Sequence, residues 1–218
     1  MAWDAVIFDC DGVLVDSEPI SNRILTGMLN ELGLAYSLRE TMERFVGRSM
    51  PSCVAIIEEE LGGPAPAGFS AEFHRRTVAA FEVDLQPVPG IREALERVPW
   101  PQCVASSGDH AKLRATLTRT GLYDRFAGRI FSALDVARGK PHPDLFLHAA
   151  ERMGADPARC AVVEDSVLGV QAGVAAGMRV FAYAGTVGGP ALAAAGAHEL
   201  FHDMAALPGL LERGQPLP

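Results

Sequence analysis

The stretch AVIFDCDGVLVDS, residues 5–17, decides the fold. Its first four residues are apolar, which is typical of a parallel strand buried on both faces of a sheet. Asp9 and Asp11 follow at the end of this strand, where open α/β sheets bind ligands, and Gly12 permits a sharp turn. Two carboxylates one residue apart repel each other, and a bound cation relieves the repulsion. A helix N-cap followed by a turn is the alternative interpretation.

Four further short apolar runs predict strands, at Cys103–Ser106, Arg129–Phe131, Ala161–Val163 and Val180–Tyr183. Segments of helical period separate these runs, at Ile91–Arg97, Ala111–Arg119, Asp144–Met153 and Val167–Ala176. An alternation of strand and helix favours right-handed crossovers. The predicted fold class is therefore α/β, with a doubly wound parallel sheet.

One long segment breaks the alternation. From about Pro19 to Glu82 the apolar residues recur only at helical spacing, first up to Gly33 and again up to Gly62. The turn-forming sequence QPVPG, residues 86–90, marks the return to the sheet. We therefore expect a Rossmann-like α/β core of residues 1–17 and 86–218, with an all-helical domain of residues 18–85 inserted into it.

Composition limits the possible functions. The net charge of -8 disfavours nucleic acid as a partner, because an acidic chain gains nothing from counterion release. No apolar run approaches the ~18 residues that a membrane span needs. The four cysteines form no Cys-x-x-Cys pair, which indicates free thiols in a reducing compartment. Because the N-terminus also lacks the basic stretch of a signal peptide, we expect a cytoplasmic protein. We also expect a monomer whose partner is a small-molecule substrate.

Polar residues follow three of the other predicted strands. Ser106 and Ser107 end one strand, Lys140 follows the next, and Glu164 and Asp165 end a third. Taken singly, the serines could form a helix-capping turn and the lysine could lie on the surface. Together they offer carboxylate oxygens for Mg²⁺ and a cation with hydroxyls for a phosphate.

These motifs resemble a known family. Asp9-x-Asp11-Gly12, then Ser106, then Lys140-Pro141, then Glu164-Asp165 are similar in order and spacing to the four motifs of the haloacid dehalogenase superfamily. The sequence VEDS, residues 163–166, followed by glycines at 169, 173 and 177, resembles the β-phosphoglucomutase-like subgroup. The resemblance spans nearly the whole chain and implies a Rossmann-like core with a helical cap inserted after the first motif.

The resemblance also implies a role for each motif. Asp9 would attack phosphorus and form an aspartyl-phosphate, and Asp11 would act as general acid and then as general base. Mg²⁺ would be held by Asp9, the carbonyl group of Asp11 and Asp165, with Glu164 as a neighbour or weaker ligand. The phosphoryl oxygens would be neutralised by Lys140, Ser106 and Ser107. In the inserted domain, we expect Arg48 to bind a second polar group on the substrate. The alternative is that Arg48 contacts only solvent.

The predicted function is a Mg²⁺-dependent phosphatase acting on a sugar phosphate or a phosphorylated sugar acid. A phosphomutase of the β-phosphoglucomutase type is the main alternative. Those mutases resemble this chain but carry a lysine, an arginine and a histidine in the cap, where this chain has Val46, Met50 and Ser21. The presence of Asp11 disfavours a dehalogenase, and the complete set of motifs disfavours a binding module without catalysis.

Overall fold

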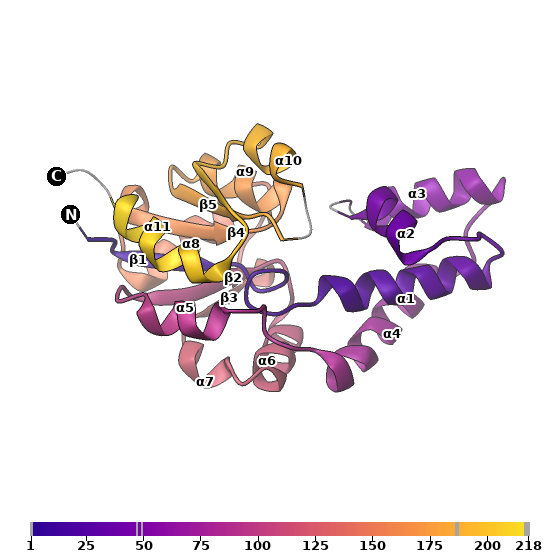
Figure 1. Cartoon of the computed structure of the whole chain (residues 1–218), viewed down its shortest axis with the longest axis horizontal. Helices are drawn as coiled ribbons and strands as arrows, with labels where there is room; N and C mark the ends of the chain where they lie inside the picture. The colour runs from indigo at the N-terminus through magenta and orange to yellow at the C-terminus, as the bar shows by residue number, and fades with distance from the viewer. Residues whose placement is uncertain (1, 47, 49, 186–187, 216–218) are drawn as a thin grey trace. The chain divides into compact units, whose positions relative to one another are not determined.

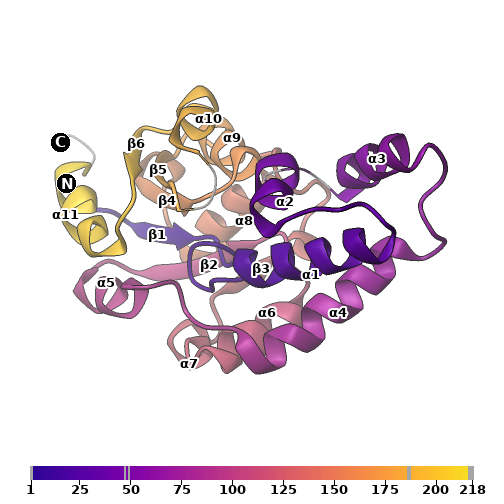
Figure 2. The same ribbon diagram turned by 45° about the vertical axis from the view of Figure 1, so that its right-hand side comes forward.

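The computed structural model describes residues 2–46, 48, 50–185 and 188–215. The chain divides into two compact units. Residues 1–16 and 86–218 form the first, here called the α/β unit, and residues 17–85 form the second, here called the helical unit. Figures 1 and 2 show that all the strands belong to the first unit.

A six-stranded parallel sheet forms the centre of the α/β unit, with the strand order β3-β2-β1-β4-β5-β6. The strands are β1 (Ala5–Phe8), β2 (Gln102–Ser106), β3 (Ile130–Ser132), β4 (Cys160–Glu164), β5 (Arg179–Tyr183) and β6 (Glu199–Phe201). All four residues of β1 are fully buried, as the unbroken apolar run predicts for a strand covered on both faces. The sheet confirms the predicted Rossmann-like α/β core.

Helices cover both faces of this sheet. They are α5 (Ile91–Arg97), α6 (His110–Arg119), α7 (Tyr123–Phe126), α8 (Asp144–Met153), α9 (Val167–Ala175), α10 (Gly189–Ala194) and α11 (Leu207–Arg213). Helix α8 packs on β1, β2 and β3, and α9 packs on β4 and β5. Both views show α9 and α10 on one side of the sheet and α5, α6 and α7 on the other (Figures 1 and 2), as right-handed crossovers in both directions from β1 require.

The C-terminal part of the α/β unit contains elements that the sequence pattern does not predict. Strand β6 has three residues, Glu199–Phe201, and pairs with β5 alone. A strand this short shows no periodicity, and the alanine-rich segment before it contains the six-residue helix α10. In the described parts of the chain, no helix combines the length and apolar character that a bilayer crossing requires.

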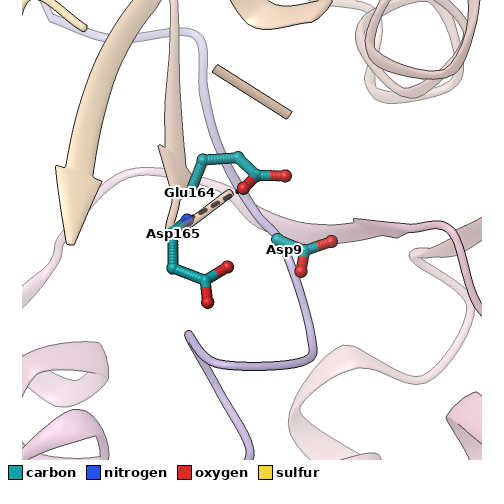
Figure 3. Close-up of side chains that lie close together, drawn as sticks. All are labelled: Asp9, Glu164 and Asp165. Carbon is teal, nitrogen blue, oxygen red and sulfur yellow. Dashed lines mark hydrogen bonds between the residues drawn. The ribbon is translucent and has the colours of Figure 1, made fainter. Parts of the chain in front are cut away.

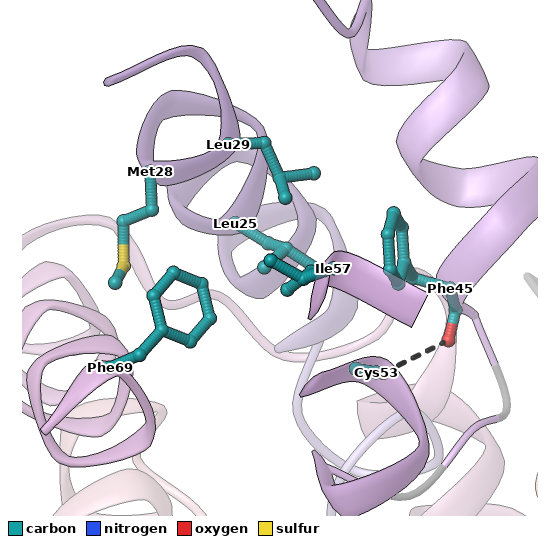
Figure 4. Packing of buried hydrophobic residues seen from close by; sticks show 7 residues of the cluster. All are labelled: Leu25, Met28, Leu29, Phe45, Cys53, Ile57 and Phe69. Carbon is teal, nitrogen blue, oxygen red and sulfur yellow. Dashed lines mark hydrogen bonds between the residues drawn. The ribbon is translucent and has the colours of Figure 1, made fainter. Parts of the chain in front are cut away.

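The helical unit consists of α1 (Glu18–Glu31), α2 (Leu38–Phe45), α3 (Met50–Leu61) and α4 (Phe69–Asp84). Helix α2 begins with a capping box, in which Ser37 and Glu40 each accept the other's backbone N–H. A separate apolar cluster forms its core and includes Leu29, Phe45, Ile57 and Phe69 (Figure 4). The predicted all-helical insert is therefore present, and it buries an apolar core of its own.

Candidate active site

Three adjacent strands bring the predicted site residues to one edge of the sheet. Strand β1 lies between β2 and β4, and Phe8 is in register with Val104 and Val163. Asp9 follows β1, Ser106 is the last residue of β2, and Glu164 is the last residue of β4. Because parallel strands end at the same edge, residues about 100 to 155 positions apart in sequence become neighbours.

The side chain of Lys140 is at the centre of this cluster. Its Nζ donates to Asp9 Oδ1 at 2.6 Å, to Glu164 Oε1 at 2.7 Å and to the carbonyl oxygen of Ala105 at 3.1 Å. Only 5% of the Lys140 side chain is exposed, so the surface alternative for this lysine is wrong. A buried ammonium that uses three acceptors is fixed in place.

Asp9, Glu164 and Asp165 form a group of buried carboxylates (Figure 3). One oxygen from each lies within 4.8 Å of the others. Glu164 has little capacity left, because its Oε2 accepts the N–H groups of Asp165 and Ser166 at 2.8 Å and the Ser166 hydroxyl at 3.0 Å. Its Oε1 accepts from Lys140. Glu164 therefore belongs to the cluster, but its oxygens are already engaged by donors.

Two glycines make room for these carboxylates. Gly12 has φ +76°, and a Cβ there would lie 1.9 Å from Asp165 Oδ2. A Cβ on Gly169 in α9 would lie 1.6 Å from Glu164 Oε1. Both separations are far below van der Waals contact, so any larger residue at either position would displace a carboxylate of the cluster.

The charge balance of the cluster is negative. Four carboxylates, those of Asp9, Asp11, Glu164 and Asp165, stand against the ammonium groups of two lysines. Burial raises the pKa of Asp9 to about 7, against the opposing pull of Lys140. A divalent cation held by carboxylate oxygens would balance the excess, and Mg²⁺ prefers such ligands. The donor set therefore fits the predicted magnesium ion.

Asp11 has a partner that the sequence analysis did not identify. The Nζ of Lys112, in α6, donates to Asp11 Oδ2 at 2.6 Å. Asp11 Oδ1 is buried and has no hydrogen-bond partner among the residues that the structure describes. Although burial opposes the charge of Lys112, the carboxylate of Asp11 raises the pKa of this ammonium. Lys112 thus fixes one oxygen of Asp11 and leaves the other available.

One compositional signal could have identified Lys112. The chain has 19 lysines and arginines, and only two of them are lysines, Lys112 and Lys140. Both lysines contact carboxylates at the same sheet edge. In a chain that otherwise uses arginine, this rarity of lysine could have marked Lys112 as a candidate site residue.

The two serines at the end of β2, Ser106 and Ser107, differ in exposure. Ser106 is 1% exposed, and its Oγ accepts the N–H of Gly108 at 3.3 Å. The capping residue of α6 is Asp109, whose Oδ1 accepts the N–H of Lys112. The Ser106 hydroxyl is therefore not needed as the helix cap, and it can still donate its proton. Ser107 is exposed.

Arg48 lies in the helical unit, and the neighbouring positions 47 and 49 of the predicted substrate loop fall outside the described residues. The side chain of Arg48 is exposed, and its Nε donates to the carbonyl oxygen of Arg44 at 2.8 Å. This bond holds the arginine against the end of α2. The roles of Arg48 and Ser107 stay predictions.

Comparison with known proteins places the chain in a family. A family model of the haloacid dehalogenase-like hydrolases matches residues 3–177. The 6-phosphogluconate phosphatase of Escherichia coli is 35% identical over 179 residues, which are 82% of this chain and 81% of that protein. The chain belongs to the haloacid dehalogenase-like hydrolases, and the predicted class of phosphohydrolase is confirmed.

Solved structures agree with this assignment. A conserved haloacid dehalogenase-like protein from Agrobacterium tumefaciens superposes with a TM-score of 0.92 at 36% identity, covering 97% of this chain and 99% of that one. A hydrolase of the family from Deinococcus radiodurans, with bound phosphate and sodium, gives 0.84 at 33% identity, covering 99% and 98%.

Proposed function

We propose that this protein is a Mg²⁺-dependent phosphatase that hydrolyses a small phosphate ester through an aspartyl-phosphate on Asp9. The observation that carries the proposal is the position of Lys140, whose Nζ lies 2.6 Å from Asp9 Oδ1 and 2.7 Å from Glu164 Oε1. A cation this close to a carboxylate at a strand end can hold a phosphoryl group against that carboxylate.

Asp9 and Asp11 divide the chemistry between them. A carboxylate oxygen of Asp9 attacks phosphorus, and the bond between phosphorus and the leaving oxygen breaks. Asp11 gives a proton to the leaving oxygen and afterwards removes one from the water that attacks the phosphoenzyme. The free Oδ1 of Asp11 supports this role, since it has no competing partner among the described residues.

The remaining site residues bind and orient. Asp9, Asp165 and the carbonyl group of Asp11 would hold Mg²⁺, which when bound would neutralise charge on the phosphoryl oxygens. Lys140, Ser106 and Ser107 would bind those oxygens. Because both oxygens of Glu164 already accept hydrogen bonds, we assign it to the positioning of Lys140, with metal ligation as its weaker role.

A sugar phosphate or a phosphorylated sugar acid is the proposed substrate class. The 35% identity to the 6-phosphogluconate phosphatase supports it. The helical unit would act as a cap over the substrate, and Arg48 would contact a second polar group. We also propose that the protein is a monomer and that it acts in the cytoplasm.

The test is a panel of phosphate esters, including p-nitrophenyl phosphate and 6-phosphogluconate, assayed for released phosphate with and without metal. We expect a chelator to abolish turnover, Mg²⁺ to restore it and Ca²⁺ to support little, because its looser shell misplaces nucleophile and phosphate. Full activity of the exhaustively demetallated protein, or a requirement for zinc alone, would contradict the proposal.

A phosphomutase on the same scaffold is the competing function. A mutase must hold a bisphosphate in two orientations, which needs cap cations, and the uncharged Val46 and Met50 argue against such a clamp. The deciding assay supplies β-glucose 1-phosphate with a trace of the bisphosphate. We expect free phosphate to form faster than glucose 6-phosphate, and the reverse order would favour the mutase.

A further inference from the structure

A cavity of about 550 Å³ lies in the α/β unit and contains none of the proposed catalytic residues. Its volume falls within the usual range of small-molecule sites. It lies beside the edge strand β3, which pairs with β2 alone in the sheet order. Residues from α6 and from α8 border it, and Ile130 and Phe131 of β3 contribute its apolar part.

Two arginines reach this cavity from different helices, Arg114 from α6 and Arg152 from α8. Among the described residues, neither arginine forms a salt bridge with a carboxylate. Arg138, by contrast, pairs with the carboxylate of Asp144, six residues further along the chain. The guanidinium of Arg114 lies 4.8 Å from the centre of the Tyr123 ring. A guanidinium stacked in this way is held in place, and its N–H groups remain available for an anion.

Among the described residues, Asp135 is the one carboxylate that borders the cavity, and both of its oxygens are engaged. Oδ1 contacts His110 Nε2 at 2.7 Å, and Oδ2 accepts the N–H of Ser132 at 2.8 Å. The carboxylate is therefore committed to its own neighbours. The two arginines leave the cavity positive in a chain whose net charge is -8.

We propose that this cavity binds a small organic phosphate, with Arg114 and Arg152 on the phosphate and Phe131 beside the organic part. A phosphate dianion matches two arginines, and guanidinium groups bind its oxygens in bidentate fashion. Phe131 is held by an edge-to-face contact with His148, with 5.6 Å between ring centroids. This site is separate from the proposed catalytic centre and does not depend on the function proposed for it.

Benzylphosphonate is a suitable probe, since its carbon–phosphorus bond cannot be hydrolysed as an ester and its ring supplies the apolar part. The ¹⁵N-labelled full chain is titrated with it, and backbone amide shifts are followed by NMR. We expect saturable shifts in residues 128–131 and 148–152, which lie away from the contact between Lys112 and Asp11 and therefore report this cavity separately from the catalytic edge. We expect a dissociation constant near the ~1 mM scale of a minimal ligand. If these amides show no saturable shifts up to roughly 20 mM benzylphosphonate, the proposal is overturned.

Two charge-matched double variants complete the test. Arg114→Gln with Arg152→Gln should raise the dissociation constant at these amides by at least about tenfold, through loss of two charge-assisted contacts. The control, Arg97→Gln with Arg119→Gln, removes the same charge outside the cavity and should leave the constant within about twofold. If both double variants weaken benzylphosphonate binding equally, the loss reflects net charge alone and the proposed site is refuted. Methylphosphonate binding as tightly as benzylphosphonate would refute the organic part.

Discussion

Among the described residues, the least exposed ion pairs of the two units differ sharply in how far they are buried. In the α/β unit, Lys140 and Glu164 pair with side chains that are 5% and 0% exposed. In the helical unit, the pair between Arg76 and Glu72 is 33% and 36% exposed. Exposed pairs stabilise a fold by about 0–1 kcal/mol, whereas buried charges are expensive to remove from water. The buried charges therefore lie in the unit that contains the proposed active site.

The largest effect should come from the nucleophile. Asp9→Asn should reduce turnover at least about a thousandfold, because an amide cannot attack phosphorus, while the far-UV circular dichroism spectrum remains that of wild type. The control Asp124→Asn changes an exposed aspartate of α7 and should retain full activity. Asp9→Asn with a tenth of the wild-type rate would remove the covalent mechanism, since that loss is only about 1.4 kcal/mol.

The next effect concerns Lys112. Lys112→Met keeps the length of the side chain but cannot hold Asp11 Oδ2, so kcat should fall about 10- to 100-fold with little change in KM. Loss should be smaller for 2,4-dinitrophenyl phosphate than for an alkyl phosphate, since a good leaving group needs less help from Asp11. An equal loss with both substrates would show that Lys112 does not act through Asp11.

A pair of glycines contrasts the two units directly. Gly169→Ala should destabilise the protein by about 1–3 kcal/mol and lower activity, because its Cβ would overlap Glu164. Gly27 is an exposed residue of α1, and a Cβ at this position would meet no neighbouring atom within 4 Å. Gly27→Ala should therefore stabilise the protein by about 0.5–1 kcal/mol. Urea denaturation measures both changes. The same sign for the two variants would contradict the contrast.

The smallest effect belongs to Arg48. Arg48→Ala should raise KM for the best sugar phosphate about three- to tenfold and leave KM for p-nitrophenyl phosphate unchanged, since the aryl ester lacks a second polar group. The control Arg39→Ala removes an exposed arginine of α2 that pairs with Glu43 and should change neither value. Equal effects of Arg48→Ala on both substrates would favour a solvated arginine.

The sequence was most informative where a periodic pattern is long or where a motif brings several reactive side chains close together. Helices α5 (Ile91–Arg97) and α8 (Asp144–Met153) match their predicted bounds, because periodicity and flanking turns agree over two or more turns. Strand β6 was missed because it follows an alanine-rich segment in which no alternation of strand and helix stands out. A motif defines Asp9 and Lys140, but Lys112 contacts Asp11 across 101 positions, and only the folded sheet brings them together.

The most direct test of the central claim is a search for the phosphoryl group on Asp9. Wild type and Asp11→Asn are mixed with 2,4-dinitrophenyl phosphate and Mg²⁺, quenched in acid during turnover, and digested for mass spectrometry. We predict a phosphoryl group on Asp9 in the N-terminal peptide, with a larger fraction in Asp11→Asn because the attacking water lacks its base. Phosphate release from the wild type with no modified Asp9, or with the phosphoryl group on another residue, would contradict the account.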